Sequence, residues 1–248
     1  MADLDAARTV VAQSCRIIGK MQMTREPAGH VSCRIPGTDR ILIKARGVGE
    51  AALTYVTPDD LIICDMDGKK VEGPDDLAAP NEVFIHTWMY RTRPDVNAVI
   101  HVHPPTVVLF TICNTELLPL IGAYDPFALQ LVLDGIPRYP RSVLISNDAL
   151  GQDLAKAVGE KNVCLMRGHG ITAVGASVEE ATITAWRLND LAEINYRARL
   201  LGTPEPISDE DIAAFRAVGA GRARRERPSG ATPYQNSTWR YLTRWIEE

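Results

Sequence analysis

The chain has 248 residues, of which 46% are hydrophobic and 23% are charged, so it is long enough to bury the core of one large domain or two small ones. It contains no run near the roughly 18 apolar residues of a membrane span, and its acidic start lacks the basic region of a signal peptide, so we expect a cytoplasmic protein without membrane contact. A net charge of −4 does not favour a nucleic-acid partner, and five scattered cysteines without a CxxC pair predict neither disulfides nor a thiolate zinc site, which leaves a small-molecule site as the expectation.

The first half of the chain predicts one helix followed by antiparallel strands. Apolar residues at three- and four-residue spacing predict an amphipathic helix over 3–20. Short β-like runs between 31 and 71 predict antiparallel strands, with a hairpin turn at Asp67-Gly68. Asn81 is expected to cap a short helix that ends near residue 93, and residues 97–103 (NAVIHVH) predict a buried strand.

The second half predicts alternating strands and helices. A strand leading into a helix is expected over 141–160, with Asn147 or Asp148 as the cap. Residues 162–175 predict two short strands around a glycine turn. Ser177 begins an S-x-x-E capping box, which predicts a long helix that Gly202 ends.

Beyond residue 203 the chain is polar and then aromatic. The aromatic residues Tyr234, Trp239 and Trp245 could cover the site of a neighbouring subunit or attach the tail to its own domain. The basic run 222–227 (RARRER) favours a solvated or intersubunit segment over a nucleic-acid contact, because the chain is net negative and carries no nucleic-acid motif.

Two of the five histidines form the sequence His101-Val102-His103 at the end of an apolar strand. Alternation along a strand puts positions i and i+2 on one face, so both imidazoles can share a metal ion. His169, between two glycines, is a third candidate. Three imidazoles leave a divalent ion net positive with an open position, which suits Lewis-acid catalysis. The alternative is that an isolated HxH simply packs, and the third histidine favours metal binding over that interpretation.

Glu82 precedes His86 by four residues, so the two side chains lie on one helical face. One interpretation is an E-x-x-x-H metal pair. The other, which we prefer for His86, is that Glu82 is a lone acid or base and His86 packs in the helix.

Four stretches together resemble the class II aldolase/adducin family: 29–37 (GHVSCRIPG), 60–69 (DLIICDMDGK), 81–105 (NEVFIHTWMYRTRPDVNAVIHVHPP) and 165–181 (LMRGHGITAVGASVEEA). The resemblance is specific, because the R-x-R-P-D-V-x-A-V-x-H-x-H block and the later GHG occur in order. It implies a single α/β/α domain over residues 1–202, with a central, mainly antiparallel sheet flanked by helices, and a C-terminal extension over 203–248.

The same resemblance implies the site. His101, His103 and His169 would hold one divalent ion, which the sequence leaves open between zinc, manganese, cobalt and iron, and Glu82 would be the acid/base or a displaceable fourth ligand. Enzymes of the family commonly form homotetramers with active sites between subunits. Tyr124 lies where related aldolases supply an aromatic acid across that interface, although it could equally be a packing residue.

The chain departs from the sugar-phosphate aldolase pattern at its phosphate-binding positions. Those enzymes carry a Gly-Asn, a Thr-Pro-Ser-Gly-like turn and a Ser-Ser before the Glu, where this chain has His30, the run 44–47 (KARG) and Asn81. His30, Lys44 and Arg46 suit a carboxylate, so we expect them, with Asn81, to bind a carboxylated substrate. The alternative is that Lys44 and Arg46 are ordinary solvent-facing charges of an edge strand.

A metal beside a carboxylate-binding set predicts a carbon–carbon lyase. The resemblance includes decarboxylases of hydroxylated aromatic or pyridine dicarboxylates, so we expect an enzyme of that kind, in which Glu82 handles the proton. The alternatives are an aldolase acting on a small hydroxy-oxo acid or sugar (phosphate) derivative, and a non-catalytic, adducin-like interaction module. The presence of all three metal-site histidines and of Glu82 argues against the last.

Overall fold

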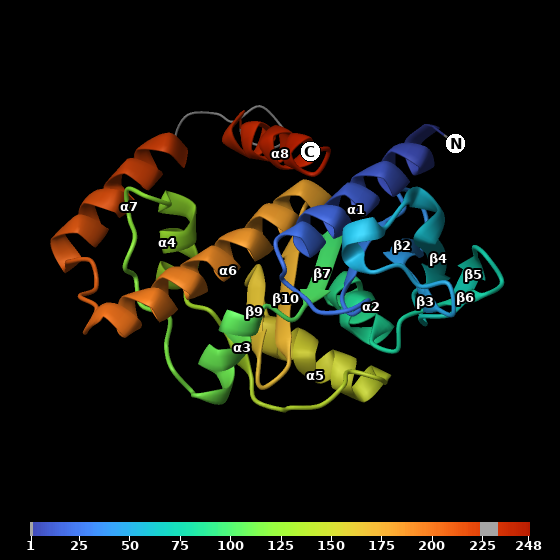
Figure 1. The fold of residues 1–248 in the computed structure, drawn as a ribbon, viewed down its shortest axis with the longest axis horizontal. Helices are drawn as coiled ribbons and strands as arrows, with labels where there is room; N and C mark the ends of the chain where they lie inside the picture. Colours follow the sequence, from blue (N-terminus) through green and yellow to red (C-terminus); the bar gives the residue numbers. More distant parts are fainter. Residues whose placement is uncertain (1, 224–232) are drawn as a thin grey trace.

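The computed structural model describes residues 2–223 and 233–248, which form one large sheet with helices on both faces (Figure 1). The sheet has eight strands in the order β5-β4-β2-β1-β7-β10-β9-β8, and all neighbours are antiparallel except β8 and β9. The expected α/β/α architecture with a mainly antiparallel sheet is confirmed. Its strands are β1 (His30–Arg34), β2 (Arg40–Lys44), β4 (Leu61–Asp65), β5 (Lys70–Glu72), β7 (Ala98–Val102), β8 (Arg138–Tyr139), β9 (Val163–Met166) and β10 (Gly170–Gly175).

The predicted hairpin joins β4 to β5. Gly68 takes a φ of +78°, and the Asp65 carboxylate accepts hydrogen bonds from the backbone N–H groups of Asp67 (3.0 Å) and Lys69 (2.9 Å). A separate short ladder pairs β3 (Arg46–Gly47) with β6 (Leu77–Ala78).

Alternation along the strands divides the core into two layers. On β7, Ile100 and Val102 pack toward the face covered by α1, α3, α4 and α6, whereas Val99 packs toward α2 and α5. His101 shares the second face with Val99, and β1 pairs with β7 so that His30 lies opposite His101. The histidines of both strands therefore leave the sheet toward α2. The covering helices are α1 (Ala2–Lys20), α3 (Pro105–Ile112), α4 (Pro126–Leu133) and α6 (Val178–Leu201) on the first face, and α2 (Val83–Thr92) and α5 (Asp148–Val158) on the second.

Helix α6 begins and ends where the sequence predicts. The Ser177 hydroxyl accepts the Glu180 N–H at 3.2 Å, the Glu180 carboxylate accepts the Ala176 N–H at 3.1 Å, and Gly202 follows the last turn. Asn147, and not Asp148, caps α5 by accepting the Leu150 N–H at 3.1 Å. The strand expected ahead of α5 is wrong, because the short strand in this region is β8, at 138–139.

The start of α2 also differs from the prediction. Asn81 does not cap it, since the helix begins at Val83 and Glu82 occupies the capping position without a side-chain cap hydrogen bond. The physical reason is that the Glu82 carboxylate is used elsewhere, accepting the backbone N–H of Ile145 at 2.8 Å. Asn81 is left exposed in the turn closed by the hydrogen bond from Val83 N–H to the Pro80 carbonyl.

The C-terminal part forms α7 (Asp209–Ala223) and α8 (Pro233–Trp245). Helix α8 lies against α1 and α6 of its own chain, where Leu242 packs with Ile17 and Ile183, and the Lys20 ammonium bonds the Trp245 carbonyl. Trp239 and Trp245 thus attach the tail to its own domain. The side chains of the basic run 222–227 and of Tyr234 lie outside the described part of the chain.

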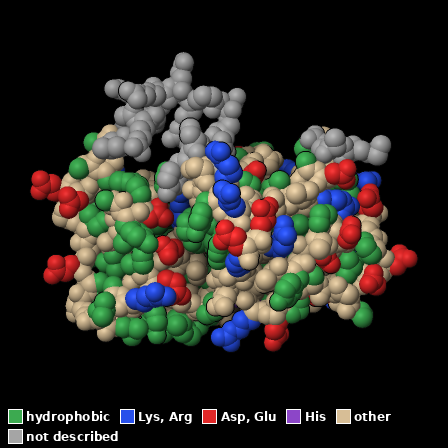
Figure 2. Space-filling model, turned by 45° about the horizontal axis from the view of Figure 1, so that its top comes forward, with side chains coloured by type: hydrophobic (Ala, Val, Ile, Leu, Met, Phe, Trp, Pro, Cys, Tyr) green, Lys and Arg blue, Asp and Glu red, His purple; other side chains and the backbone are tan. Residues whose placement is uncertain are grey.

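The surface carries both signs of charge. On the face drawn in Figure 2, acidic and basic side chains are interspersed, and hydrophobic side chains gather toward the end of the molecule that carries α4 and α7. Within residues 2–223 and 233–248, every helix is too short or too polar to cross a membrane.

Candidate metal centre

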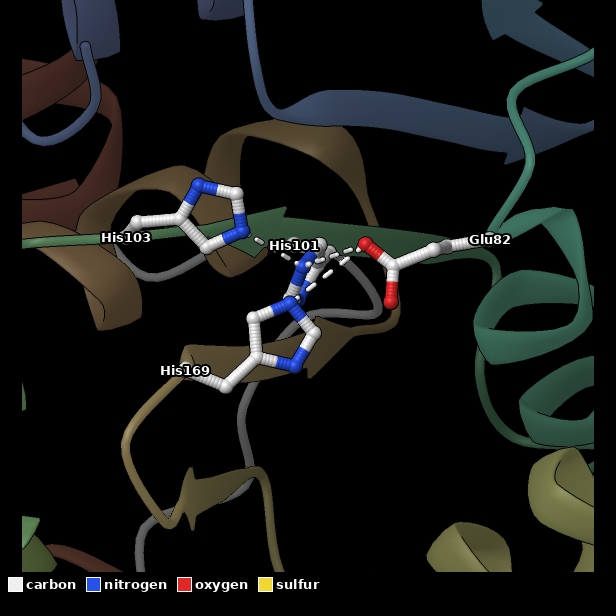
Figure 3. Close-up of side chains that lie close together, drawn as sticks. All are labelled: Glu82, His101, His103 and His169. Carbon is white, nitrogen blue, oxygen red and sulfur yellow. Dashed lines mark hydrogen bonds and ion pairs between the residues drawn. The ribbon is translucent and has the colours of Figure 1, made fainter. Parts of the chain in front are cut away.

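Four side chains from three parts of the fold converge at one point (Figure 3). Glu82 comes from the start of α2, His101 from the end of β7, His103 from just beyond it, and His169 from the turn between β9 and β10. One ligand atom from each lies within 4.8 Å of the others. The predicted same-face placement of His101 and His103 is confirmed, and the structure brings His169 and Glu82 to them.

The distances show how closely the nitrogen and oxygen atoms face one another. His101 Nε2 and His103 Nε2 are 2.9 Å apart, and Glu82 Oε2 lies 3.5 Å from His101 Nε2 and 3.4 Å from His169 Nε2. The side chains of Glu82 and His101 are buried, while His103 and His169 are partly exposed, so one side of the cluster remains accessible.

The orientation of His101 identifies its free nitrogen. Its Nδ1 lies 2.9 Å from the Ile171 carbonyl, which only an Nδ1–H can satisfy. Nε2 of the neutral ring therefore carries a lone pair that points into the cluster. This second hydrogen bond is the arrangement that orients histidine ligands in metal sites.

The electrostatics favour a cation at the same point. Burial by itself raises the pKa of Glu82, but hydrogen bonds and charge interactions with His101 and His169 lower it well below its usual range, so Glu82 is a carboxylate. Burial lowers the pKa of His103 to about 3, so this imidazole is neutral at neutral pH. Within the described residues, no Lys or Arg forms an ion pair with Glu82. A buried carboxylate beside imidazole nitrogens fits a divalent ion.

The glycines around His169 make this packing possible. Gly168 has a φ of +58°, and a Cβ on Gly170 would lie 2.2 Å from the Val102 carbonyl oxygen and 2.7 Å from Cδ2 of His103. The close approach of β10 to β7 therefore requires glycine here, and it puts His169 beside the other two imidazoles.

His30 lies at the edge of this cluster. Its ring stacks on that of His101, with centroids 5.5 Å apart and an angle of 26° between the planes. His86 is not one of the four clustered residues. Its Nδ1 lies 2.7 Å from the Ser32 hydroxyl, which agrees with the packing interpretation of His86.

The structure places Lys44 on the other face of the sheet from His30 and pairs its charge within the fold. Its side chain is fully buried, and the ammonium bonds the Glu50 carboxylate and the Pro27 carbonyl at 2.8 Å. The reason is alternation, because Lys44 shares its sheet face with Leu42, on the α1 side, and His30 leaves the sheet on the other face.

Arg46, Asn81 and Tyr124 are all exposed. The Arg46 guanidinium donates from Nε to the Ala79 carbonyl at 2.9 Å, which ties it to the segment leading into Glu82. Tyr124 is 74% exposed, and no described contact joins it to Glu82 or to the histidines of its own chain.

Sequence reasoning missed two polar residues beneath the cluster. Ser32 and Tyr90 are buried, and their hydroxyls lie 2.7 Å apart. Ser32 follows His30 by two positions on a strand, so alternation could have indicated it. Nothing in the local sequence distinguishes Tyr90 from a core aromatic.

The chain is similar to a known family and to individual members of it. The sequence model of the family described as Class II Aldolase and Adducin N-terminal domain matches residues 9–196. The 3,4-dihydroxyphthalate decarboxylase of Arthrobacter keyseri is 35% identical over 219 residues, which cover 86% of this chain and 87% of that protein. The L-fuculose phosphate aldolase of Escherichia coli (strain K12) is 27% identical over 208 residues, covering 84% and 90%.

The fold recurs in solved structures. An aldolase II superfamily protein from Pseudomonas syringae superposes with a TM-score of 0.84 at 23% identity, and the match covers 100% of this chain and 94% of that one. Fold, site and relatives together define a carbon–carbon lyase of a divalent-metal-dependent class. The chain belongs to the class II aldolase and adducin family, as the resemblance of its motifs implies.

Proposed function

We propose that this enzyme removes CO₂ from a hydroxylated aromatic dicarboxylate of the 3,4-dihydroxyphthalate type. The observation that carries the proposal is the 35% identity to a 3,4-dihydroxyphthalate decarboxylase over most of both chains, against 27% to an L-fuculose phosphate aldolase. The replacement of the aldolase-like phosphate-binding residues by His30 and Arg46 supports it, because imidazole and guanidinium groups suit a carboxylate.

His101, His103 and His169 would hold one divalent ion, with Glu82 beside it. The donor set is compatible with zinc, manganese, cobalt or iron, so availability decides among them. When bound, such an ion supplies Lewis acidity that stabilises negative charge on the oxygen atoms of the substrate.

Glu82 is suited to move the proton. Its Oε1 is fixed by the Ile145 N–H at 2.8 Å, which leaves Oε2 facing His101 and the partly exposed His169. As a carboxylate, Oε2 can take the proton of a ring hydroxyl. When the bond between the ring and the leaving carboxylate breaks, its electron pair stays on the ring carbon, and Oε2 returns the proton there as CO₂ departs.

The remaining predicted residues would bind the substrate from the rim. Asn81 is next to Glu82, and Arg46 is tied to the same segment through Ala79. We expect Arg46 to bind the retained carboxylate, with His30 on the opposite side of the site.

Oligomerisation completes the proposal. We propose a homotetramer in which the exposed Tyr124 serves the site of a neighbouring subunit. The structure supports it with an apolar hollow that Leu109 of α3 and Tyr196 of α6 line together, and with further exposed apolar side chains on the same two helices, Ile112, Leu200 and Leu201.

The test combines metal analysis with product analysis. Elemental analysis of purified enzyme should give about one ion per chain, and metal-loaded enzyme should release CO₂ from 3,4-dihydroxyphthalate. Aldehyde release from a hydroxy-oxo acid or sugar phosphate without CO₂ release would favour the aldolase alternative. Failure to retain metal under any loading condition would favour the adducin-like module and contradict the enzymatic proposal.

A further inference from the structure

A chain of buried polar groups runs from helix α2 to the edge of the metal centre. The Tyr90 hydroxyl lies 2.7 Å from the Ser32 hydroxyl, which lies 2.7 Å from His86 Nδ1. On its other side, His86 Nε2 lies 3.4 Å from His30 Nδ1. Tyr90, Ser32 and His86 are all buried, so each proton in this chain must go to a partner within it.

The direction of these hydrogen bonds follows from the Tyr90 end. Burial raises the pKa of Tyr90 well above its usual value, so its hydroxyl keeps the proton. Among the described residues, the Tyr90 hydroxyl bonds Ser32, so the Tyr90 proton goes to the Ser32 oxygen.

The rest of the chain then has one consistent arrangement. The Ser32 hydroxyl has two described partners, the Tyr90 hydroxyl and His86 Nδ1. Because Ser32 accepts the proton of Tyr90, it donates its own proton to His86 Nδ1. Burial lowers the pKa of His86 to about 3, so its ring is neutral and carries its single proton on Nε2. That N–H donates to His30 Nδ1, which leaves the proton of a neutral His30 on Nε2.

His30 Nε2 is the free end of the chain. Within the described residues it has no hydrogen-bond partner, and the His30 ring is partly exposed and stacked on His101. Its N–H is thus presented at the rim of the metal centre with a direction fixed by three buried groups.

We propose that His30 donates a hydrogen bond from Nε2 to a carboxylate oxygen of the ligand, and that His86, Ser32 and Tyr90 are positioning residues that hold His30 in this tautomer. This inference deepens the proposed function and rests on its assignment of a carboxylated substrate. A donor that is already oriented binds a carboxylate without the free-energy cost of reorienting the imidazole. This lowers KM more than it raises kcat.

A matched pair of variants at position 86 separates positioning from packing. Gln can replace the N–H donor of His86 toward His30, whereas Met has a similar size and no donor. We expect H86M to weaken phthalate binding, measured by calorimetry on metal-loaded enzyme, about tenfold, the effect of one hydrogen bond to a charged group. H86Q should stay within about threefold of wild type. Thr87→Val is the control on the same helix, because the buried Thr87 hydroxyl has no hydrogen-bond partner in the described structure and its loss should leave binding unchanged.

A spectroscopic measurement reports the tautomer without turnover. ¹⁵N NMR of the histidine side chains, with the His30 signals assigned by their loss in H30Q, should place the His30 proton on Nε2 in wild type and H86Q. In H86M we expect a shift toward the Nδ1–H form.

The outcomes distinguish this inference from the proposed function. An Nδ1–H tautomer in wild type, equal phthalate affinities of H86M and H86Q, or no phthalate binding by wild type would each overturn the inference. Phthalate binding with the expected variant pattern, but no CO₂ release from 3,4-dihydroxyphthalate, would support the inference and overturn the decarboxylase. Normal CO₂ release, with phthalate binding by H86M indistinguishable from wild type, would support the decarboxylase and overturn the inference.

Discussion

At the scale of single residues, the two oxygens of Glu82 have different tasks. Oε1 accepts a backbone N–H from Ile145, and Oε2 faces His101 and His169. The same carboxylate gives up the capping position of α2, where a side chain would ordinarily bond the first turn. Local helix stability is thus exchanged for a buried anion at the site.

Glu82→Gln should separate proton transfer from metal binding. The amide oxygen can still accept the Ile145 N–H, so the fold and the three imidazoles stay in place. We expect metal content near that of wild type and a kcat at least about 100-fold lower, the typical contribution of a general acid or base. Elemental analysis measures the metal content, and CO₂ release measures kcat. The comparison is His103→Ala, which should lose metal and turnover together. Full activity of E82Q would remove Glu82 from the mechanism.

The buried His86 predicts a pH dependence of stability. Its pKa is lowered by burial from 6.5 to about 3, so between these values the unfolded chain binds a proton that the folded chain does not. This term is absent above pH 6.5, and it reduces stability progressively as the pH falls toward 3.

His86→Gln removes that term. On going from about pH 7.5 to about pH 5.5, wild type should lose about 1.4 kcal/mol more unfolding free energy than H86Q. Urea unfolding at both pH values, at one protein concentration and with a chelator present, measures the difference. Equal losses in the two proteins would contradict the assignment.

At the scale of elements, the site depends on how closely strands approach. His101 and His103 follow from alternation within β7, but His169 reaches them because β10 pairs with β7, with Thr172 opposite His101. The turn before β10 is tight, and its two glycines allow the backbone to pass beside His103.

Gly170→Ala should therefore damage the site through the backbone. The added Cβ would meet the Val102 carbonyl oxygen at 2.2 Å and His103 Cδ2 at 2.7 Å. We expect metal affinity to fall at least about tenfold and the unfolding free energy to fall by about 1–3 kcal/mol. Metal titration and thermal unfolding check both, with Gly202→Ala as the control, because a Cβ there has nothing within 4 Å and should change stability by less than about 0.5 kcal/mol. Unchanged metal affinity in G170A would show that β10 can shift without cost.

At the scale of the whole molecule, one apolar surface is left uncovered by the described residues 2–223 and 233–248. Leu109 on α3 and Tyr196 on α6 line one hollow of about 300 Å³. Leu201, at the end of α6, is 93% exposed. Scattered apolar residues are ordinary on a surface, but a group on two adjacent helices fits an interface.

The tetramer proposal makes this surface testable. Light scattering coupled to gel filtration should give the mass of four chains for wild type, and Leu109→Glu should yield a smaller species, because burying a carboxylate in an apolar contact costs desolvation free energy. If this surface forms the interface, the variant that no longer assembles should also lose activity. A wild-type monomer with full activity would contradict the tetramer proposal. A tetramer of L109E would contradict the assignment of the interface to this surface.

The sequence by itself determined the elements whose signals are local. The capping box at Ser177 and the glycine at 202 defined α6, Asp67-Gly68 defined a hairpin, and the two-residue spacing of His101 and His103 placed both imidazoles on one face. Each of these depends on a few neighbouring residues, so short-range rules suffice. The glycines around His169 and the position of Glu82 made both residues candidates, and the resemblance of whole motifs supplied the family and joined them to the other two histidines.

Only the tertiary structure decided which charged and polar groups share that face. Lys44 lies among site-like residues in sequence, but strand pairing sends it to the opposite side of the sheet, where it bonds Glu50. Glu82 leaves the cap of α2 because Ile145, 63 residues away, offers a backbone N–H. Ser32 and Tyr90 become partners of His86 only when β1 packs beneath α2. Contacts between residues distant in sequence depend on strand order and register, and these are properties of the folded chain as a whole.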